Sequence, residues 1–159
     1  TQENIVDSIA EFEKQLTTPN SRFDLFLKGQ KDALTNKELE GYKLFKSSGC
    51  ISCHNGINIG GNLYQKMGIM KKYEVENMNL GKYNITKKER DKYYYKVPSL
   101  RNIDLTAPYL HTGKAENLDS AVKIMFEYQL GMNAKDDEID KIVTFLKTLS
   151  GEIPKLTDN

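Results

Sequence analysis

Both cysteines of this 159-residue chain lie in one five-residue motif, Cys50-Ile-Ser-Cys53-His54, and this motif limits the possible folds more than any other feature. Two thiols about one helical turn apart can reach the two vinyl groups on adjacent edges of a porphyrin. The next residue then lies beneath the iron, where an imidazole can bind the metal. We therefore predict one covalent c-type haem, attached through Cys50 and Cys53, with His54 as an iron ligand.

Three other interpretations of the motif compete on the residues alone. A thioredoxin-like redox pair follows a strand in a strand–helix–strand context, and the sequence shows no such context. A zinc site could combine Cys50, Cys53, His54 and His111, but adjacent ligands do not match the usual zinc spacing. Two buried, unreactive thiols are the third possibility. A disulfide framework is not expected from only two cysteines so close together.

Charge and hydropathy exclude several classes of partner. The net charge is +1, from 23 basic and 22 acidic residues, which does not indicate a nucleic-acid or anionic-membrane binder. No apolar run approaches the roughly 18 residues that a membrane span needs. Lysines do gather locally, either as a solvated face or as a docking patch for an acidic redox partner. They are Lys71, Lys72, Lys82, Lys87, Lys88, Lys92 and Lys96.

Helical periodicity and capping signals predict an all-α domain. The spacing of Ile5, Ile9, Phe12 and Leu16 indicates an amphipathic helix, and a capping box begins at Thr35. Helices are predicted over residues 4–16, 21–27, 36–47, 117–130 and from 133 to the Gly-Pro stop signals near 151–154. We see neither a strand pattern nor an internal repeat.

Residues 55–98 have little periodicity and several glycines, so we predict mostly loop with short helical or extended pieces. So long a loop is unusual in a compact domain unless it wraps a large prosthetic group. The expected architecture is therefore one cytochrome c-like helical domain over residues 1–159. Residues 1–30 lead into it, 35–130 form the haem-binding core, and 133–159 form the last helix and tail.

The second axial ligand of the iron would decide the chemistry. A thioether holds a high reduction potential, whereas a vacant position permits oxygen or peroxide chemistry. Spacing alone does not choose among the candidates, and a methionine at helical spacing is more often part of a core. The candidates are Met67, Met70, Met78, Met125, Met132 and His111.

Three blocks of the sequence resemble the second haem domain of bacterial di-haem cytochrome c peroxidases and their MauG-like relatives. They cover residues 49–61, 97–113 and 117–131, and Thr18–Asp24 resembles the segment that enters that domain. The resemblance implies that Met125 is the second iron ligand of a high-potential haem. Arg101 lies in the second block, where its guanidinium fork suits a haem propionate. His111 is expected near the haem edge or in a structural role.

The resemblance also marks what this chain lacks. The family reduces peroxide at a haem in its first domain, whereas this chain has one attachment motif and no tryptophan to lie between two haems. Thr106 and Pro108 match positions whose backbone oxygens help to bind calcium between the two domains, so this chain offers only part of a calcium site. A Met125–iron bond would close the iron to peroxide.

The sequence therefore predicts an electron-transfer domain, with a haem peroxidase within a longer di-haem enzyme, or a gas sensor, as the alternatives. Its expected partner is a redox protein or a peroxidatic haem domain. Haem c attachment implies an extracytoplasmic compartment, most simply the periplasm. The opening residues Thr-Gln-Glu-Asn are not a signal peptide, so we expect that the signal has been removed or that the chain is part of a longer protein.

Overall fold

The computed structural model describes residues 1–74 and 79–154. Its helical body consists of α2 (Arg22–Leu27), α3 (Asn36–Ser47), α5 (Leu118–Ile124) and α6 (Asp136–Leu146), joined by long irregular segments. Short 3₁₀ turns lie at Lys31–Ala33, Cys50–Ser52, Glu89–Asp91, Ile103–Leu105 and Lys147–Leu149. The predicted capping box at Thr35 is confirmed, because its side chain accepts from the Glu38 amide while the Glu38 carboxylate accepts from the Thr35 amide.

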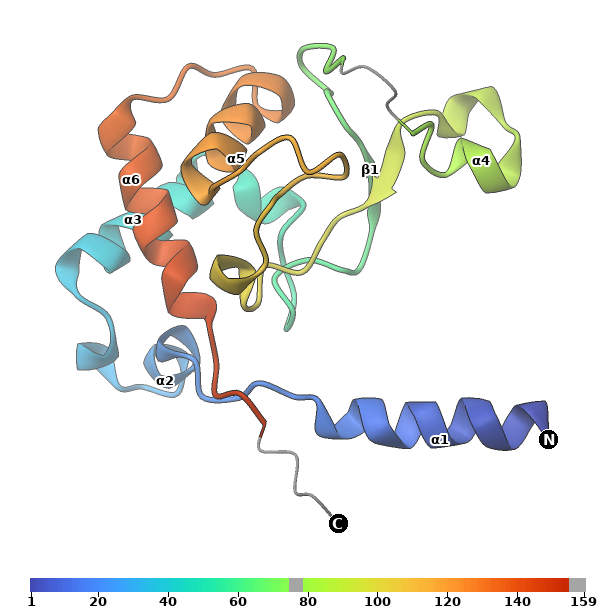
Figure 1. The fold of residues 1–159 in the computed structure, drawn as a ribbon. Coiled ribbons are helices and arrows are strands. Elements are labelled where there is room, and N and C mark those ends of the chain that lie inside the picture. Colours follow the sequence, from blue (N-terminus) through green and yellow to red (C-terminus); the bar gives the residue numbers. More distant parts are fainter. Residues whose placement is uncertain (75–78, 155–159) are drawn as a thin grey trace.

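The core lies where α6 crosses α3 (Figure 1). A Cβ atom on Gly41 of α3 would lie 2.0 Å from the Lys141 carbonyl oxygen of α6, so only glycine allows the two backbones to come this close. Phe145 of α6 is 1% exposed and contacts the rings of Phe23 and Phe45, with centroids 5.2 and 5.3 Å away. These aromatic contacts attach α2 and α3 to the last helix.

The predicted helix over 117–130 changes its winding partway along. It begins at its predicted Asn117 cap and continues as α5 to Ile124, after which Met125–Gln129 forms a π-helical turn. Single π turns inside helices are rare and frequently occur at functional sites. The turn begins at Met125, the methionine that the family resemblance singles out.

The all-α expectation holds for the core but not for the loop. Residues 55–98 contain a two-stranded antiparallel sheet, β1 (Tyr64–Lys66) with β2 (Tyr94–Lys96), and the short helix α4 (Tyr83–Thr86). Each strand has only three residues, which is too short for an alternating pattern to appear in the sequence. Figure 1 shows this strand pair and α4 on the side of the molecule away from α6.

The first helix, α1 (Gln2–Gln15), projects away from this body (Figure 1). None of its residues is buried, although it has the amphipathic spacing that the sequence predicts. No helix within residues 1–74 and 79–154 is long and apolar enough to cross a membrane.

Candidate functional site

The Cys50–His54 motif follows α3 directly and is wound as a tight turn. Residues Cys50–Ser52 form a 3₁₀ turn, and the amides of Cys53 and His54 both donate to the Cys50 carbonyl, at 3.2 and 2.9 Å. This winding places the two thiols and the imidazole within five residues of one compact loop. Both cysteines are free thiols and both are half-buried.

Burial controls the chemistry of this loop. It raises the pKa of the Cys50 thiol, against a smaller opposing effect of the Ser48 hydroxyl, which lies 3.6 Å from the sulfur. Reactive redox thiols have a lowered pKa, so this environment disfavours a thioredoxin-like pair. Burial also lowers the pKa of His54, although the Pro98 and Ile59 carbonyls partly offset the fall. His54 is therefore neutral near pH 7, as an iron ligand must be.

Backbone strain surrounds His54. Ile59 has φ of 49°, a left-handed conformation that is unfavourable for a β-branched residue. Its neighbour Gly60 has φ of 129°, and a Cβ atom there would lie 2.1 Å from the Pro98 carbonyl oxygen. The Gly61 amide then donates to the Val97 carbonyl at 2.8 Å. Strain of this kind persists where the surrounding structure enforces it, commonly at a functional site.

His54 Nδ1 is a buried nitrogen without a hydrogen-bond partner within the described parts of the chain. A buried polar atom without a partner is costly, so it needs an explanation. Coordination of a haem iron through Nε2 would leave the proton on Nδ1, and the Pro98 and Ile59 carbonyls that affect the His54 pKa are the groups that could accept it. Two free thiols beside a neutral, half-buried imidazole thus fit the donor set of haem c.

Met125 is half-buried at the first position of the π turn. The same turn is tied to the loop by Gln129, whose Oε1 accepts from the amides of Gly68 and Ile69 at 2.5 and 3.1 Å. Gln129 Nε2 also donates to the Lys66 carbonyl at 3.1 Å. The sequence analysis missed this role of Gln129, since nothing local links it to residues sixty positions earlier.

The other candidate ligands differ in exposure. Met70 and Met132 are exposed, by 64% and 46%, while Met67 is half-buried beside β1. Met78 lies outside the described residues. His111 is exposed and packs on the Tyr95 ring, with centroids 4.4 Å apart.

The zinc interpretation gains no support from this arrangement. Across residues 1–74 and 79–154, no three His, Cys, Asp or Glu side chains gather closely enough to hold a metal ion. His111 is thus not brought together with the two cysteines.

Arg101 does not present a free fork to a haem propionate. Its two terminal nitrogens donate to the Asp24 carboxylate at 2.9 and 2.8 Å, and its Nε donates to the Ile57 carbonyl at 2.8 Å. The sequence analysis missed Asp24, which is 77 positions away along the chain. Arg101 therefore links α2 to the segment after His54, and the expectation that it binds a propionate gains no support from this structure.

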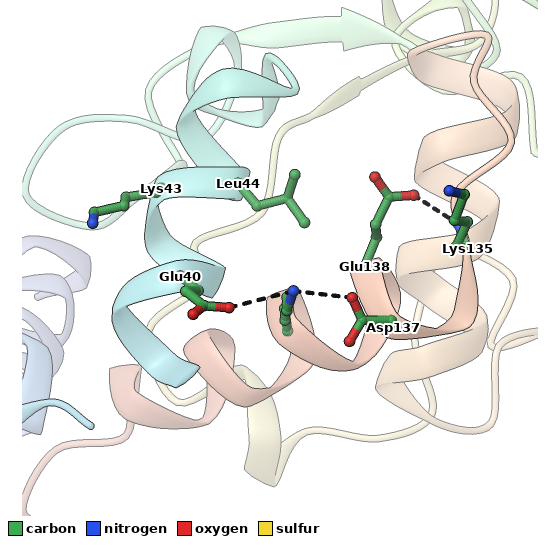
Figure 2. A pocket seen from close by; sticks show the side chains of 7 residues that line it. Glu40, Lys43, Leu44, Lys135, Asp137 and Glu138 are labelled. Carbon is green, nitrogen blue, oxygen red and sulfur yellow. Dashed lines mark hydrogen bonds and ion pairs between the residues drawn. The ribbon is translucent and has the colours of Figure 1, made fainter. Parts of the chain in front are cut away.

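Figure 2 shows a separate surface hollow between α3 and α6. Lys141 lies in it and pairs with Glu40 and Asp137, at 3.3 and 2.9 Å. Apart from Leu44, every residue that lines the hollow is charged, and none belongs to the predicted haem site. We regard it as a solvated ion-pair network at the helix crossing.

Comparisons with known proteins agree with this site. The cytochrome c family matches residues 39–150. The chain is 51% identical over 152 residues to a cytochrome c551 peroxidase of Nitrosomonas europaea, and 48% identical over 152 residues to the cytochrome c peroxidase Ccp of Escherichia coli. These alignments cover 96% and 94% of this chain but 46% and 33% of the relatives.

More distant relatives extend the same pattern. A methylamine utilization protein MauG of Methylorubrum extorquens is 23% identical, with 97% of this chain and 46% of MauG aligned. The solved structure of a MauG-like protein associated with microbial copper homeostasis superimposes with a TM-score of 0.73 at 25% identity, over 84% of this chain and 49% of that one. The chain thus spans about half, or less, of the proteins it matches. With its attachment motif and buried histidine, this chain belongs to the cytochrome c family and is homologous to one haem domain of the di-haem cytochrome c peroxidases.

Proposed function

We propose that this chain is an electron-transfer domain that carries one haem c with His54 and Met125 as the two iron ligands. The observation that carries the proposal is a neutral, half-buried His54 beside two free thiols, and it is supported by a half-buried methionine at the start of a π turn elsewhere in the chain. When bound, the haem would supply a one-electron couple, and a thioether ligand would keep its potential high.

The protein's own residues would attach, orient and shield this group. Cys50 and Cys53 would fix the porphyrin by thioether bonds, and the Pro98 and Ile59 carbonyls beside the ring would orient His54. Gln129 would hold the loop after β1 against the π turn that begins at Met125, and we propose that this loop shields the methionine from water. A closed, water-poor site favours electron transfer over chemistry at the iron.

The relatives support a further domain as the partner. Because the matched peroxidases are at least about twice as long, we propose that this domain passes electrons to a peroxidatic haem domain, or receives them from a separate redox protein. Haem c attachment favours an extracytoplasmic, periplasmic location. Calcium binding by the backbone at Thr106 and Pro108 would need a group from the other domain.

Replacement of Met125 by Ala tests the ligand set. We expect loss of the far-red methionine–iron band and a lower reduction potential, with the haem still attached. Met70→Ala is the matched control, since Met70 is 64% exposed and should leave both readouts unchanged. A Met125→Ala spectrum that matches the parent protein would refute this ligand assignment.

Attachment itself is tested by intact mass and an absorption spectrum of protein made in a host that matures c-type cytochromes. We expect the mass of one haem on the chain, and its loss after denaturing extraction when Cys50 and Cys53 are both replaced by Ala. A colourless chain with the mass of its amino acids alone would refute the proposal.

Peroxide reduction is the second candidate function, because the similar proteins of Nitrosomonas and Escherichia are named as peroxidases. This chain would take part in it as the electron-donating half. Turnover of hydrogen peroxide by the isolated chain, together with a high-spin ferric spectrum, would instead assign the peroxidase reaction to this domain and refute Met125 ligation.

A further inference from the structure

Helix α1 carries an apolar face that nothing within the described parts of the chain covers. Ile9 and Phe12 are 53% and 50% exposed, and Leu16, just beyond the helix, is 43% exposed. A monomeric protein rarely leaves so many large side chains in a row in water, and such a face usually marks an interface. A partner is therefore expected to cover it.

The last helix of the same chain indicates which kind of surface could cover α1. Residues 6–16 and 139–149 align without gaps, with five identities in eleven positions. The three identical apolar pairs are Ile9 with Ile142, Phe12 with Phe145 and Leu16 with Leu149. In the last helix and the turn after it, Ile142, Phe145 and Leu149 are only 2%, 1% and 1% exposed. A match of eleven residues is too short for a structural repeat, so it concerns one helix face and not a repeated unit.

The contacts of Phe145 show which surface this pattern of apolar residues packs against in α6. Its ring lies among Phe23, Tyr42 and Phe45, at centroid distances of 5.2, 5.3 and 5.3 Å. Next to Tyr42, Gly41 allows α6 to approach the α3 backbone. The matching surface is therefore a helix with a glycine, followed at one and four positions by aromatic residues.

We propose that α1 is the closing helix of a second cytochrome c domain, and that it packs there on the first-helix face as α6 packs on α3. A second copy of this chain does not offer that face, because α6 already covers the Gly41 side of α3. A different cytochrome c domain whose own last helix is α1 would offer it, and the matched relatives have the length for such a domain. This inference takes one point from the proposed function, namely that a second haem domain exists as the partner.

The proposal moves the domain boundary. The haem domain of this chain would begin after α1, near Thr18, whose hydroxyl accepts from Asn102 at 2.8 Å, and near Ser21, which is buried. Pro19 also belongs to this domain, since its carbonyl accepts from the Glu152 amide at 2.8 Å. The 17 residues before Thr18 would be part of the neighbouring domain.

Hydrogen exchange in two proteins tests this inference. One is the isolated chain, and the other is a chimaera in which this chain replaces the matching 152 residues of the Nitrosomonas peroxidase. In the isolated chain, we expect fast exchange of the α1 amides and a Tm that Ile9→Ser with Phe12→Ser does not change. In the chimaera, we expect at least 100-fold slower exchange in α1, lost in the same double variant but kept in the control Glu11→Ser.

Three results would overturn the proposal. The first is equally fast α1 exchange in the chimaera and the isolated chain. The second is protection of α1 in the isolated monomer, which would assign the face to this domain. The third is a dimer in sedimentation that the double variant dissociates, which would assign it to a second copy. Haem mass and spectrum, measured on the same samples, report separately on the proposed function.

Discussion

Replacement of Asp24 by Asn removes the charge from a pair that connects two parts of the haem domain. The Asp24 and Arg101 side chains are only 15% and 21% exposed, and they meet through two hydrogen bonds. Asn keeps the shape and can still accept from the Ser21 amide, as Asp24 does at 3.1 Å. The variant therefore tests the ion pair and spares the helix cap.

The expected loss in the free energy of unfolding lies between the losses known for exposed and for buried ion pairs. Exposed pairs contribute up to about 1 kcal/mol, whereas loss of one partner of a buried pair costs about 3–5 kcal/mol. For this largely shielded, two-bond pair we expect about 2 kcal/mol, which in a domain of this size lowers Tm by about 4–8 °C. Asp140→Asn is the matched control, because Asp140 pairs with Lys37 where both side chains are about half exposed.

The assay is thermal and chemical unfolding of the haem-loaded protein, with Arg101→Gln and the double variant completing a cycle. A cost of Asp24→Asn no larger than that of Asp140→Asn, or a cycle with no coupling, would refute the assigned role.

The Asp24–Arg101 pair also predicts a pH dependence of stability. The Arg101 hydrogen bond is the main factor that holds the pKa of Asp24 below its ordinary value of 3.8. Its stabilisation is therefore full above pH 3.8 and disappears as the pH falls through the lower folded-state pKa.

Three further changes test the packing around the site. Gly41→Ala places a methyl group against the Lys141 carbonyl, and we expect a loss of about 3 kcal/mol in denaturant unfolding. Phe145→Ala should cost about 4 kcal/mol in the same assay, since its ring is fully buried; a cost below 1 kcal/mol would contradict the core described here. Gly60→Ala forces a side chain against the Pro98 carbonyl at φ of 129°, so we expect a several-fold lower yield of haem-loaded protein by absorbance.

Local signals predicted most of the helical core. The caps at Thr35 and Asn117 and the apolar spacing of 139–146 place α3, α5 and α6 correctly, because each depends on neighbours within a few positions. The last helix begins at Asp136, three residues later than predicted. The pairing of β1 with β2 was missed because three-residue strands carry no periodicity. The π turn was missed because its five residues have the pattern of an ordinary helix.

The site was predictable only as far as its motif. The roles of Cys50, Cys53 and His54 are predicted from spacing and that of Met125 from the family resemblance, and all four stay predictions. Arg101 shows the limit of such reasoning. Its chemistry suits any carboxylate, and nothing local in the sequence indicates that Asp24 lies within reach. Only a folded structure brings together residues so far apart along the chain.

The π turn at Met125 has a consequence for which deletions this helix can tolerate. A π turn contains one residue more than an α turn, and each residue rotates an α-helix by about 100°. A π turn therefore accommodates its extra residue while the chain beyond it keeps its direction. Removal of one residue between Phe126 and Gln129 would restore regular winding and leave Gln129 directed at the loop it binds. The same one-codon deletion within α5 would instead rotate the rest of the helix by about 100° and break that contact.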